Sequence, residues 1–291
     1  MKEYSLAEIF CEGNDRVGYG HIRRSLVLAK QLEKDGVDVR ITGLSEEARR
    51  LLPKYIISKR KAQVRIFDTP SDVDDMISKS RANGHITVAL DCFGEIAPDV
   101  NIAVYPHFEV RGTCASYVGF EYILIREEIS LLHRSPISEE AKQVLVFLGG
   151  GDLLNQGHET ARILSQQGLE VTLVQGPLAM NKNEGDGYRV LVNPTELPQL
   201  LASSDWAVTN GGGSLFEAMC VGKATVVLPQ TDAEEKIACY AEARGAILGI
   251  GLDCLRKYNQ DELGIVAKET VNLVDGRGAE RISAIVRGLL L

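Results

Sequence analysis

Short apolar runs that are typical of β-strands alternate with helical patterns along almost the whole chain, and this alternation starts twice. The first half opens with a strand-like run over 7–11, a glycine-containing turn and a helix over 23–34. The second half opens with a strand over 144–148, three consecutive glycines and a helix over about 156–167. Strands that are apolar on both sides suit parallel sheets covered by helices on both faces. The pattern therefore predicts an α/β protein with two Rossmann-like domains that face each other across a cleft.

The remaining elements follow the same alternation. We expect further strands over 37–42, 64–67, 86–90, 102–105, 122–125, 171–174, 190–192, 207–209 and 224–228. We expect helices over 71–83 with Ser71 as the N-cap, near 196–202, 215–220 and 234–243, and through most of 261–291. The stretch 130–142 has a weak strand signal and contains Pro136, so we take it as the connection between the halves.

Length and charge limit the classes of function. A chain of 291 residues suits two domains of moderate size. Its formal net charge of -8 argues against a broad nucleic-acid interface, which needs clustered Lys and Arg. It argues equally against a strongly basic face for membrane binding, although net charge does not exclude a local basic patch.

The N-terminus and the cysteines indicate the compartment. Residues 1–13 lack the apolar core and cleavage site of a signal peptide, and no apolar run is long enough to span a bilayer. The six cysteines form no Cys-x-x-Cys pair, and most lie in apolar stretches, which favours buried reduced thiols over disulfides or a zinc site. We therefore expect a cytoplasmic protein with no transmembrane segment and no metal site.

The turn after the first strand contains Gly18 and Gly20, which allow a tight bend and a close approach of backbone to ligand. His21 then falls near the start of a helix, where the positive end of the dipole attracts anions and favours a neutral imidazole able to accept a proton. His21 as general base and His21 as a simple polar cap are equally supported by spacing alone. The dinucleotide-binding fingerprint is absent, because its third glycine would fall at Arg23.

A second glycine turn follows the strand 207–209 and runs from Asn210 through three glycines to Ser214, which could cap the next helix. Such a turn can hold a diphosphate with backbone N–H groups, and three consecutive glycines are costly unless the backbone needs them. Glu217 lies one turn into the helix, where its carboxylate could accept hydrogen bonds from a ribose diol. Its alternative role is that of a capping glutamate at the third helical position.

Three further sets of residues follow predicted strands near the expected cleft. The turn Gly149, Gly150, Gly151 and Asp152 mirrors the first-half loop and either lines the cleft or serves only as a turn. The charged triplet Arg126, Glu127 and Glu128 and the acidic Asp91 also follow strands, where they could contact a sugar. The other histidines lack ligand spacing, and we expect them to be surface or packing residues: His85, His107, His133 and His158.

Three stretches together resemble the glycosyltransferase-B (GT-B) superfamily, namely 18–29, 119–128 and 147–152. The resemblance is to the branch that contains the UDP-sugar hydrolases of the pseudaminic-acid pathway and related spore-coat polysaccharide proteins. The lipid II-forming N-acetylglucosaminyltransferase is a more distant relative. The second stretch is the most specific, because members outside this branch do not generally share it.

The resemblance implies roles for individual residues. The family histidine that acts on the attacking water corresponds to His21, and the nucleotide-binding glycine turn and glutamate correspond to 211–214 and Glu217. It implies no metal and no cofactor. It also implies an N-terminal domain over 1–129 for the sugar, a C-terminal domain over 142–275 for the nucleotide, and a final helix over 276–291 that packs back on the first domain.

The chain departs from the family pattern at three places, all in the sugar-binding half. An Arg-x-Asp element of the hydrolases is replaced by Cys11-Glu12-Gly13, a histidine by Cys92, and an acidic cluster by Tyr105-Pro106-His107. These replacements leave open which sugar is bound, and whether water is the acceptor.

The sequence therefore predicts hydrolysis of a nucleotide-sugar, UDP-linked in the first instance, at the anomeric C–O bond, with His21 as general base. The alternatives are a glycosyltransferase that uses the same donor and a catalytically silent binding subunit. A basic run at Arg49, Arg50, Lys54, Lys59, Arg60 and Lys61 keeps a lipid acceptor and peripheral membrane contact open. The residues expected to bind substrate or nucleotide are Gly18, Tyr19, Gly20, Arg24, Asp91, Arg126, Glu127, Glu128, Gly149, Gly150, Gly151, Asn210, Gly211, Gly212, Gly213, Ser214 and Glu217.

Overall fold

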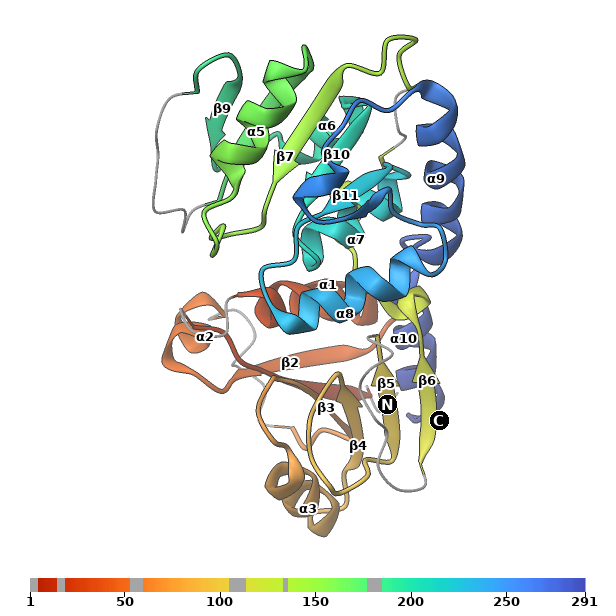
Figure 1. Ribbon diagram of the computed structural model, residues 1–291. Coiled ribbons are helices and arrows are strands. Elements are labelled where there is room, and N and C mark those ends of the chain that lie inside the picture. Colours follow the sequence, from red (N-terminus) through yellow and green to blue (C-terminus); the bar gives the residue numbers. More distant parts are fainter. Residues whose placement is uncertain are drawn as a thin grey trace. The chain divides into compact units, whose positions relative to one another are not determined.

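The computed structural model describes residues 5–14, 19–52, 60–104, 114–132, 136–176 and 185–290. The chain forms two compact units (Figure 1). The first unit combines Met1–Arg126 with Gly276–Leu291, and the second consists of Glu127–Asp275. The last helix of the chain thus belongs to the first unit.

The first unit is built on a parallel sheet of six strands in the order β2-β1-β3-β4-β5-β6. The strands are β1 (Leu6–Cys11), β2 (Asp38–Gly43), β3 (Val64–Asp68), β4 (Ile86–Leu90), β5 (Val100–Ala103) and β6 (Ala115–Val118). The helical elements are α1 (Gly20–Lys34), α2 (Glu46–Leu51), α3 (Asp74–Ala82), the 3₁₀ turn η2 (Phe120–Tyr122) and α10 (Gly278–Gly288).

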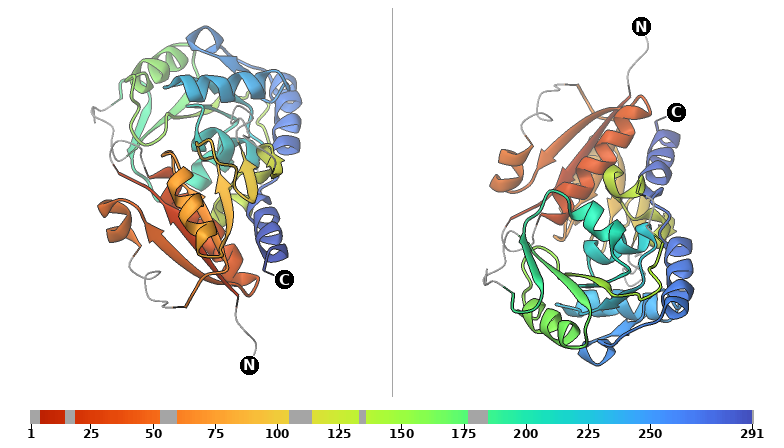
Figure 2. Two further views of the ribbon diagram at one scale, coloured as in Figure 1. Left: turned by 90° about the horizontal axis from the view of Figure 1, so that it is seen from below. Right: turned by 90° about the horizontal axis from the view of Figure 1, so that it is seen from above.

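Helix α1 forms because its apolar side chains recur at helical spacing, and it buries Leu28, Ala29 and Leu32 completely. Helix α10 lies alongside α1 and η2 (Figure 2). The Ser283 hydroxyl of α10 donates to the Asp35 carboxylate at 2.6 Å. The C-terminal segment is therefore held in the first unit by both packing and hydrogen bonds.

The second unit has its own parallel sheet of six strands in the order β12-β11-β10-β7-β8-β9. The strands are β7 (Gln143–Phe147), β8 (Glu170–Gln175), β9 (Arg189–Val192), β10 (Trp206–Thr209), β11 (Thr225–Val227) and β12 (Gly249–Ile250). The helical elements are α4 (Glu127–Ser130), α5 (Gly157–Gln166), α6 (Leu197–Ser203), α7 (Gly213–Val221), α8 (Asp232–Glu242), η3 (Leu252–Cys254) and α9 (Gln260–Leu273). Its core includes Trp206, which is fully buried with its ring edge-on to Tyr258 at 5.3 Å.

The predicted pair of Rossmann-like sheets is confirmed, with differences in detail. The strand predicted over 122–125 is wrong: η2 and an extended segment outside the sheet take its place. Ile123 and Ile125 are buried, as the apolar run indicates, but α10 packs here with Gly278 against the carbonyl of Ile123. The predicted strand 102–105 begins two residues earlier, at Val100, and residue 105 lies outside the described chain.

The predicted N-cap at Ser71 is also wrong. Helix α3 begins at Asp74, and the hydroxyl of Ser71 instead donates to Glu12 at 2.8 Å. The Asp72 carboxylate accepts from the N–H of Asp74, which opens the helix. The sequence pattern also missed α2, β6 and β12, which are all short.

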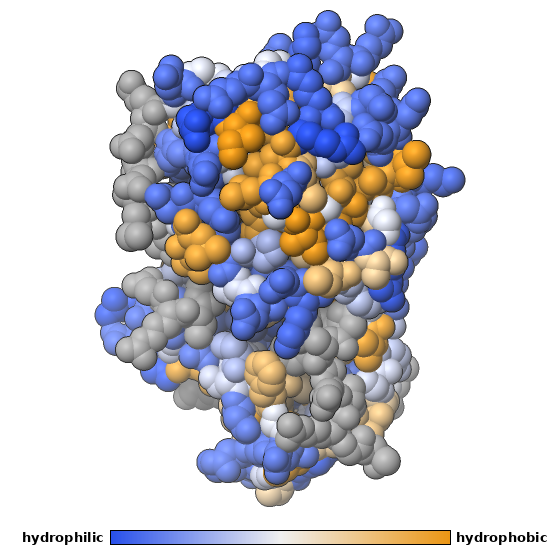
Figure 3. All heavy atoms as spheres, viewed as in Figure 1, coloured by the Kyte–Doolittle hydropathy of each residue, from blue (hydrophilic) through white to orange (hydrophobic). Residues whose placement is uncertain are grey.

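No helix among the described residues is both long enough and apolar enough to cross a membrane. The space-filling view shows hydrophilic residues over much of this face and an apolar patch on the second unit (Figure 3). The three described arginines of the basic run have local partners: Arg49 donates to the carbonyl of Gly43, Arg50 pairs with Glu46, and Arg60 pairs with Asp38.

Candidate functional site

Each sheet has one place where the chain reverses the direction in which it adds strands. In the first sheet, β2 lies on one side of β1 while β3 and the later strands lie on the other. In the second sheet, β8 and β9 lie on one side of β7, while β10 to β12 lie on the other. Ligands of open parallel sheets bind at the carboxyl ends of the strands beside such a switch point. The first predicted glycine turn follows β1, and the second follows β10, which lies next to β7.

At the switch point of the first sheet, His21 is hydrogen-bonded to a buried carboxylate. His21 is the second residue of α1, and its Nδ1 lies 2.7 Å from Oδ1 of Asp68, the last residue of β3. The side chain of Asp68 is 1% exposed and that of His21 is 19% exposed. His21 therefore reaches solvent while its partner does not.

Arg24, one turn further along α1, joins Asp68 to Asp91. Its Nε donates to Oδ1 of Asp68 at 2.8 Å, and its Nη1 donates to Oδ2 of Asp91 at 2.9 Å. Asp91 follows β4 with a positive φ of 48°, and its other oxygen accepts the N–H of Val104 at 2.7 Å. The predicted residues His21, Arg24 and Asp91 thus form one cluster, and Tyr19 and Gly20 precede them at the start of α1.

The charge on Asp68 follows from its partners. Burial acts to raise the pKa of this carboxyl, but the Arg24 guanidinium and the hydrogen bond from His21 outweigh it, so the pKa lies below its ordinary value. The second oxygen accepts the hydroxyl of Ser25 at 2.8 Å. Asp68 is therefore an ionised, fully hydrogen-bonded carboxylate.

Because Asp68 is ionised, we can assign which ring nitrogen of His21 carries the hydrogen that faces it. A carboxylate can only accept, so Nδ1 of His21 carries a hydrogen, and in the neutral ring the lone pair lies at Nε2. The approach of Arg24 Nη2 to Nδ1 at 3.1 Å is then a contact between two donors that share Oδ1 of Asp68. Nε2 has no hydrogen-bond partner among the described residues. This arrangement orients the ring so that Nε2, in the neutral tautomer, can accept a proton.

Asp68 is the residue that sequence reasoning missed. The predicted strand 64–67 ended one residue too early, because Asp rarely lies within a strand. An acidic residue directly after an apolar strand was a usable signal, and the same signal was followed for Asp91.

The second glycine turn links β10 to α7. Helix α7 begins at Gly213, so the amides of Gly213 and Ser214 lie in the first turn of the helix, where they have no acceptor within the helix. A Cβ on Gly213 would meet no atom within 4 Å, so there is open space beside the first residue of the helix. Backbone N–H groups at a helix N-terminus are a common binding site for phosphate.

Two expected side-chain roles in this turn are corrected by the structure. Ser214 does not cap α7: its hydroxyl donates to Oδ1 of Asn210, and the N-cap residue is Gly212. Glu217 is the fifth residue of α7 and not the third, so it cannot complete a capping box. It is half-buried, one turn beyond the amides of the glycine turn.

The loop after β7 lies beside the β10–α7 turn. Gly149 has a φ of 74°, and a Cβ there would lie 3.1 Å from Nδ2 of Asn210. Gly150 and Gly151 continue the loop to Asp152, whose carboxylate accepts the N–H groups of Gln156 and Gly157 at 2.9 and 2.8 Å. Asp152 therefore initiates α5, and the predicted glycine residues of the second half are brought together.

The triplet 126–128 lies at the boundary between the units. Arg126 ends the first unit, while Glu127 and Glu128 are exposed at the start of α4, which packs against α7. Gly18 lies outside the described residues, as do residues 105–107.

Of the other four histidines, two lie in the described part of the chain, and both have hydrogen-bond partners within the protein. His85 is buried and its Nδ1 lies 2.7 Å from the carbonyl of Ala62, and burial lowers its pKa. Nδ1 of His158 lies 2.7 Å from the hydroxyl of Tyr188. His107 and His133 lie outside the described residues. Among the residues that the structure describes, no group of His, Cys, Asp and Glu is arranged to hold a metal ion.

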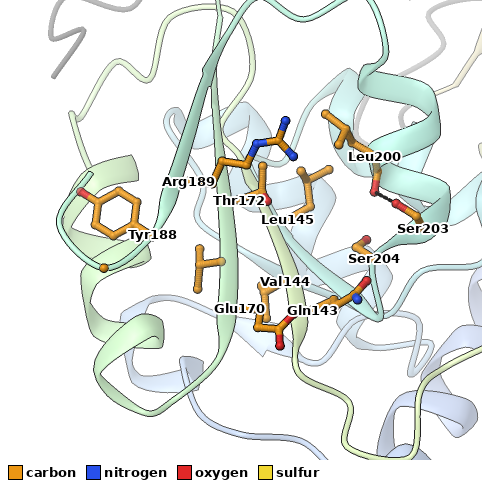
Figure 4. A pocket seen from close by; sticks show the side chains of 12 residues that line it. Gln143, Val144, Leu145, Glu170, Thr172, Tyr188, Arg189, Leu200, Ser203 and Ser204 are labelled. Atoms are coloured by element: carbon orange, nitrogen blue, oxygen red, sulfur yellow. Dashed lines mark hydrogen bonds between the residues drawn. The ribbon is translucent and has the colours of Figure 1, made fainter. Parts of the chain in front are cut away.

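A cavity of about 430 Å³ opens at the amino ends of the strands of the second sheet. Its lining includes Gln143, Glu170 and Arg189, the first residues of β7, β8 and β9, with Leu200 and Ser203 of α6 beside them (Figure 4). These are amino ends of strands, whereas the glycine turns follow carboxyl ends. The cavity is therefore separate from the candidate site.

Comparison with known proteins shows that the chain shares its fold with GT-B glycosyltransferases. No protein-family profile matches it. Spore coat polysaccharide biosynthesis protein SpsG of Bacillus subtilis (strain 168) is 23% identical over 337 aligned positions, which cover 97% of each chain. The crystal structure of MurG from Acinetobacter baumannii superimposes with a TM-score of 0.67 at 13% identity, over 98% of this chain and 99% of that one. The glycosyltransferase SsfS6 from Streptomyces sp. SF2575, complexed with thymidine diphosphate, gives 0.58 at 11% identity, over 98% and 100%.

Proposed function

We propose that this chain, a GT-B superfamily member by its fold, is an enzyme that transfers a sugar from a nucleotide-sugar donor to an acceptor hydroxyl. The observation that carries the proposal is the pair formed by His21 and Asp68 at the switch point of the first sheet. It supplies an oriented general base. The open glycine turn at the switch point of the second sheet would supply the diphosphate site.

In the proposed reaction, Nε2 of His21 removes the proton of the acceptor hydroxyl as its oxygen attacks the anomeric carbon. The new C–O bond forms while the bond from that carbon to the phosphate oxygen breaks, and the nucleoside diphosphate leaves with the electron pair. The Asp68 carboxylate stabilises the imidazolium that results. The N–H groups of Gly213 and Ser214 stabilise the charge of the leaving diphosphate.

The proposal also covers which nucleotide carries the sugar and in which kind of biosynthesis the enzyme acts. Glu217 would accept hydrogen bonds from the ribose, as expected from the sequence. UDP is the expected carrier, and the thymidine diphosphate complex of one structural neighbour makes a thymidine-linked donor the first comparison. The name of the Bacillus relative supports a role in polysaccharide biosynthesis. The cytoplasmic location expected from the sequence is part of the same proposal.

Hydrolysis, the main expectation from the sequence, is the second candidate. The structural neighbours favour transfer, because glycosyltransferases are prominent among them. The same geometry nevertheless suits water: Nε2 of His21 can deprotonate a water molecule as well as a sugar hydroxyl. The products distinguish the two reactions.

The deciding experiment incubates the protein with UDP-, dTDP-, GDP- and CMP-sugars, with and without polysaccharide fragments and lipid-linked saccharides as acceptors. Mass spectrometry follows nucleotide, free sugar and acceptor. A glycosylated acceptor with little free sugar supports transfer. Free sugar in equal amount to nucleotide, independent of acceptor, indicates the hydrolase. Absence of nucleotide release and of nucleotide binding across the panel would refute both.

A further inference from the structure

Glu234, on the first turn of α8, connects two loops at the carboxyl edge of the second sheet. Its Oε1 accepts a hydrogen bond from Nδ2 of Asn210 in the β10–α7 turn. Its Oε2 accepts the backbone N–H of Gln230 in the β11–α8 loop at 2.8 Å. Both oxygens of this half-buried carboxylate therefore have donors from the loops around the glycine turn.

Gln230 extends the same network to a third loop. Its Oε1 accepts the N–H of Leu154 at 2.9 Å, and its Nε2 donates to Oε1 of Gln156 at 3.1 Å. Leu154 and Gln156 lie in the loop after β7, beside the glycine turn. The three loops that surround the expected diphosphate site are thus joined by one set of hydrogen bonds with Glu234 at its centre.

The glycines of the turn also pack directly on Glu234. A Cβ on Gly211 would overlap the carbonyl oxygen of Glu234 and lie 2.8 Å from its Cβ. A Cβ on Gly212 would lie 3.1 Å from Oε1 of Glu234. Gly213, by contrast, meets no atom within 4 Å. The first two glycines therefore accommodate α8, whereas the third leaves space for a ligand.

Asn210 transmits this contact to the start of α7. Its Nδ2 is bound by Glu234, and its Oδ1 accepts the hydroxyl of Ser214, the second residue of the helix. The side-chain oxygen of Asn210 and the hydroxyl hydrogen of Ser214 are therefore engaged within the turn, and the backbone N–H groups are the donors that the start of the helix presents to an anion. The direction of those N–H groups depends on the conformation of the turn.

We infer that Glu234 is a positioning residue, whose carboxylate holds turn 210–214 in the conformation that binds the diphosphate of the donor. The inference rests on the proposed function for the identity of the ligand. Glu234 acts through Asn210 and Gly211, since both of its oxygens already accept hydrogen bonds from the protein. Alanine removes both acceptors, and glutamine retains only one.

The test compares Glu234→Ala and Glu234→Gln with Glu235→Ala, which removes the exposed neighbouring carboxylate on the same turn of α8. Calorimetry with UDP and dTDP gives affinity, and steady-state kinetics with the active donor separates KM from kcat. Hydrogen exchange over residues 209–216 reports the turn without any ligand.

For Glu234→Ala we expect Kd and KM to rise about tenfold or more, kcat to stay within about threefold, and exchange over 209–216 to accelerate. Glu234→Gln should show a smaller change in the same direction, and Glu235→Ala should match wild type. Wild-type exchange in Glu234→Ala would overturn the inference, whatever the protein binds. A collapse of kcat at unchanged KM would overturn it too, since Glu234 would then act on the reacting groups. If exchange accelerates but wild type binds no nucleoside diphosphate, the proposed function fails and the structural role of Glu234 remains.

Discussion

At the residue scale, the hydrogen bond between His21 and Asp68 decides which ring nitrogen can act. The two residues are 47 positions apart and meet only because β3 lies beside β1 in the sheet. The positive charge of Arg24 lies beside the same carboxylate and lowers the pKa of Asp68, so Asp68 stays ionised. Arg24 contacts the ring of His21 at Nδ1.

We expect His21→Asn to lower kcat by about 10²- to 10⁴-fold, which is the usual loss when a general base is removed. Nucleotide affinity should be retained, because diphosphate binding is assigned to the second unit. Turnover and calorimetric UDP binding are measured on the same preparation. A variant with normal turnover would exclude His21 from the mechanism, and a parallel loss of UDP binding would make it a phosphate ligand.

Asp68→Asn should lower kcat on the order of 10²-fold or more while KM for the donor changes little. The amide cannot hold the Nδ1–H tautomer of His21 in the way that a carboxylate does. The matched control is Asp75→Asn, an exposed carboxylate on α3 that pairs with Lys79. Equal activity of the two variants would show that Asp68 serves only the fold.

The lowered pKa of Asp68 also predicts a dependence of stability on acid. The folded state keeps this carboxyl ionised at pH values where the unfolded chain, with a pKa of about 3.9, binds a proton. The contribution is therefore present above about pH 4 and is lost as the pH falls further. Urea unfolding between pH 3 and 6 should show a shallower decline for Asp68→Asn than for wild type. Identical slopes would contradict the assignment.

At the element scale, the glycines at the start of α7 have two different surroundings. Gly211 and Gly212 are packed against α8, while Gly213 begins the helix with no neighbour where its Cβ would be. A side chain there costs the folded protein nothing but takes up space next to the first-turn amides. Helix stability and ligand binding can therefore be separated at this position.

Gly213→Ala should weaken UDP binding by about tenfold or more without lowering Tm, because only the ligand meets the added methyl group. Gly264→Ala is the matched control: Gly264 lies within α9, and a Cβ there also meets no atom within 4 Å. Alanine within a helix stabilises by about 0.5–1 kcal/mol relative to glycine, so this control should raise Tm and leave binding unchanged. Unchanged binding in Gly213→Ala would remove the glycine turn from the diphosphate site.

At the scale of the whole molecule, the described residues form two sheets, each with a switch point beside a predicted glycine turn, and the sequence lacks the dinucleotide-binding fingerprint. UDP or a UDP-sugar should therefore raise Tm more than NAD does, because a ligand that binds only the native state stabilises it by mass action. A thermal-shift assay with equal concentrations of the ligands checks this. A larger shift with NAD would contradict the proposed ligand class.

The amino-acid sequence by itself determined the class of fold, because strand and helix signals are local. Apolar runs, helical spacing and the glycine turns predicted the two parallel sheets. His21 was named from its place after a glycine turn at the start of a helix, Asp91 from its place after a strand, and Arg24 as a binding residue within the stretch 18–29 that carries the family resemblance. Local signals also misled: the apolar run at 122–125 reflects burial beside α10 and not pairing in the sheet.

Only the tertiary structure decided which side chains are partners. Asp68 joins His21 because two strands pair, and Glu234 joins Asn210 because α8 packs on the turn of α7. Both contacts link residues far apart in the chain, so no pattern within a window of sequence contains them. The tertiary structure also showed that the side chains of Ser214 and Asn210 hydrogen-bond to each other, and that Asn210 bonds to Glu234, which gives both residues a part in holding the turn.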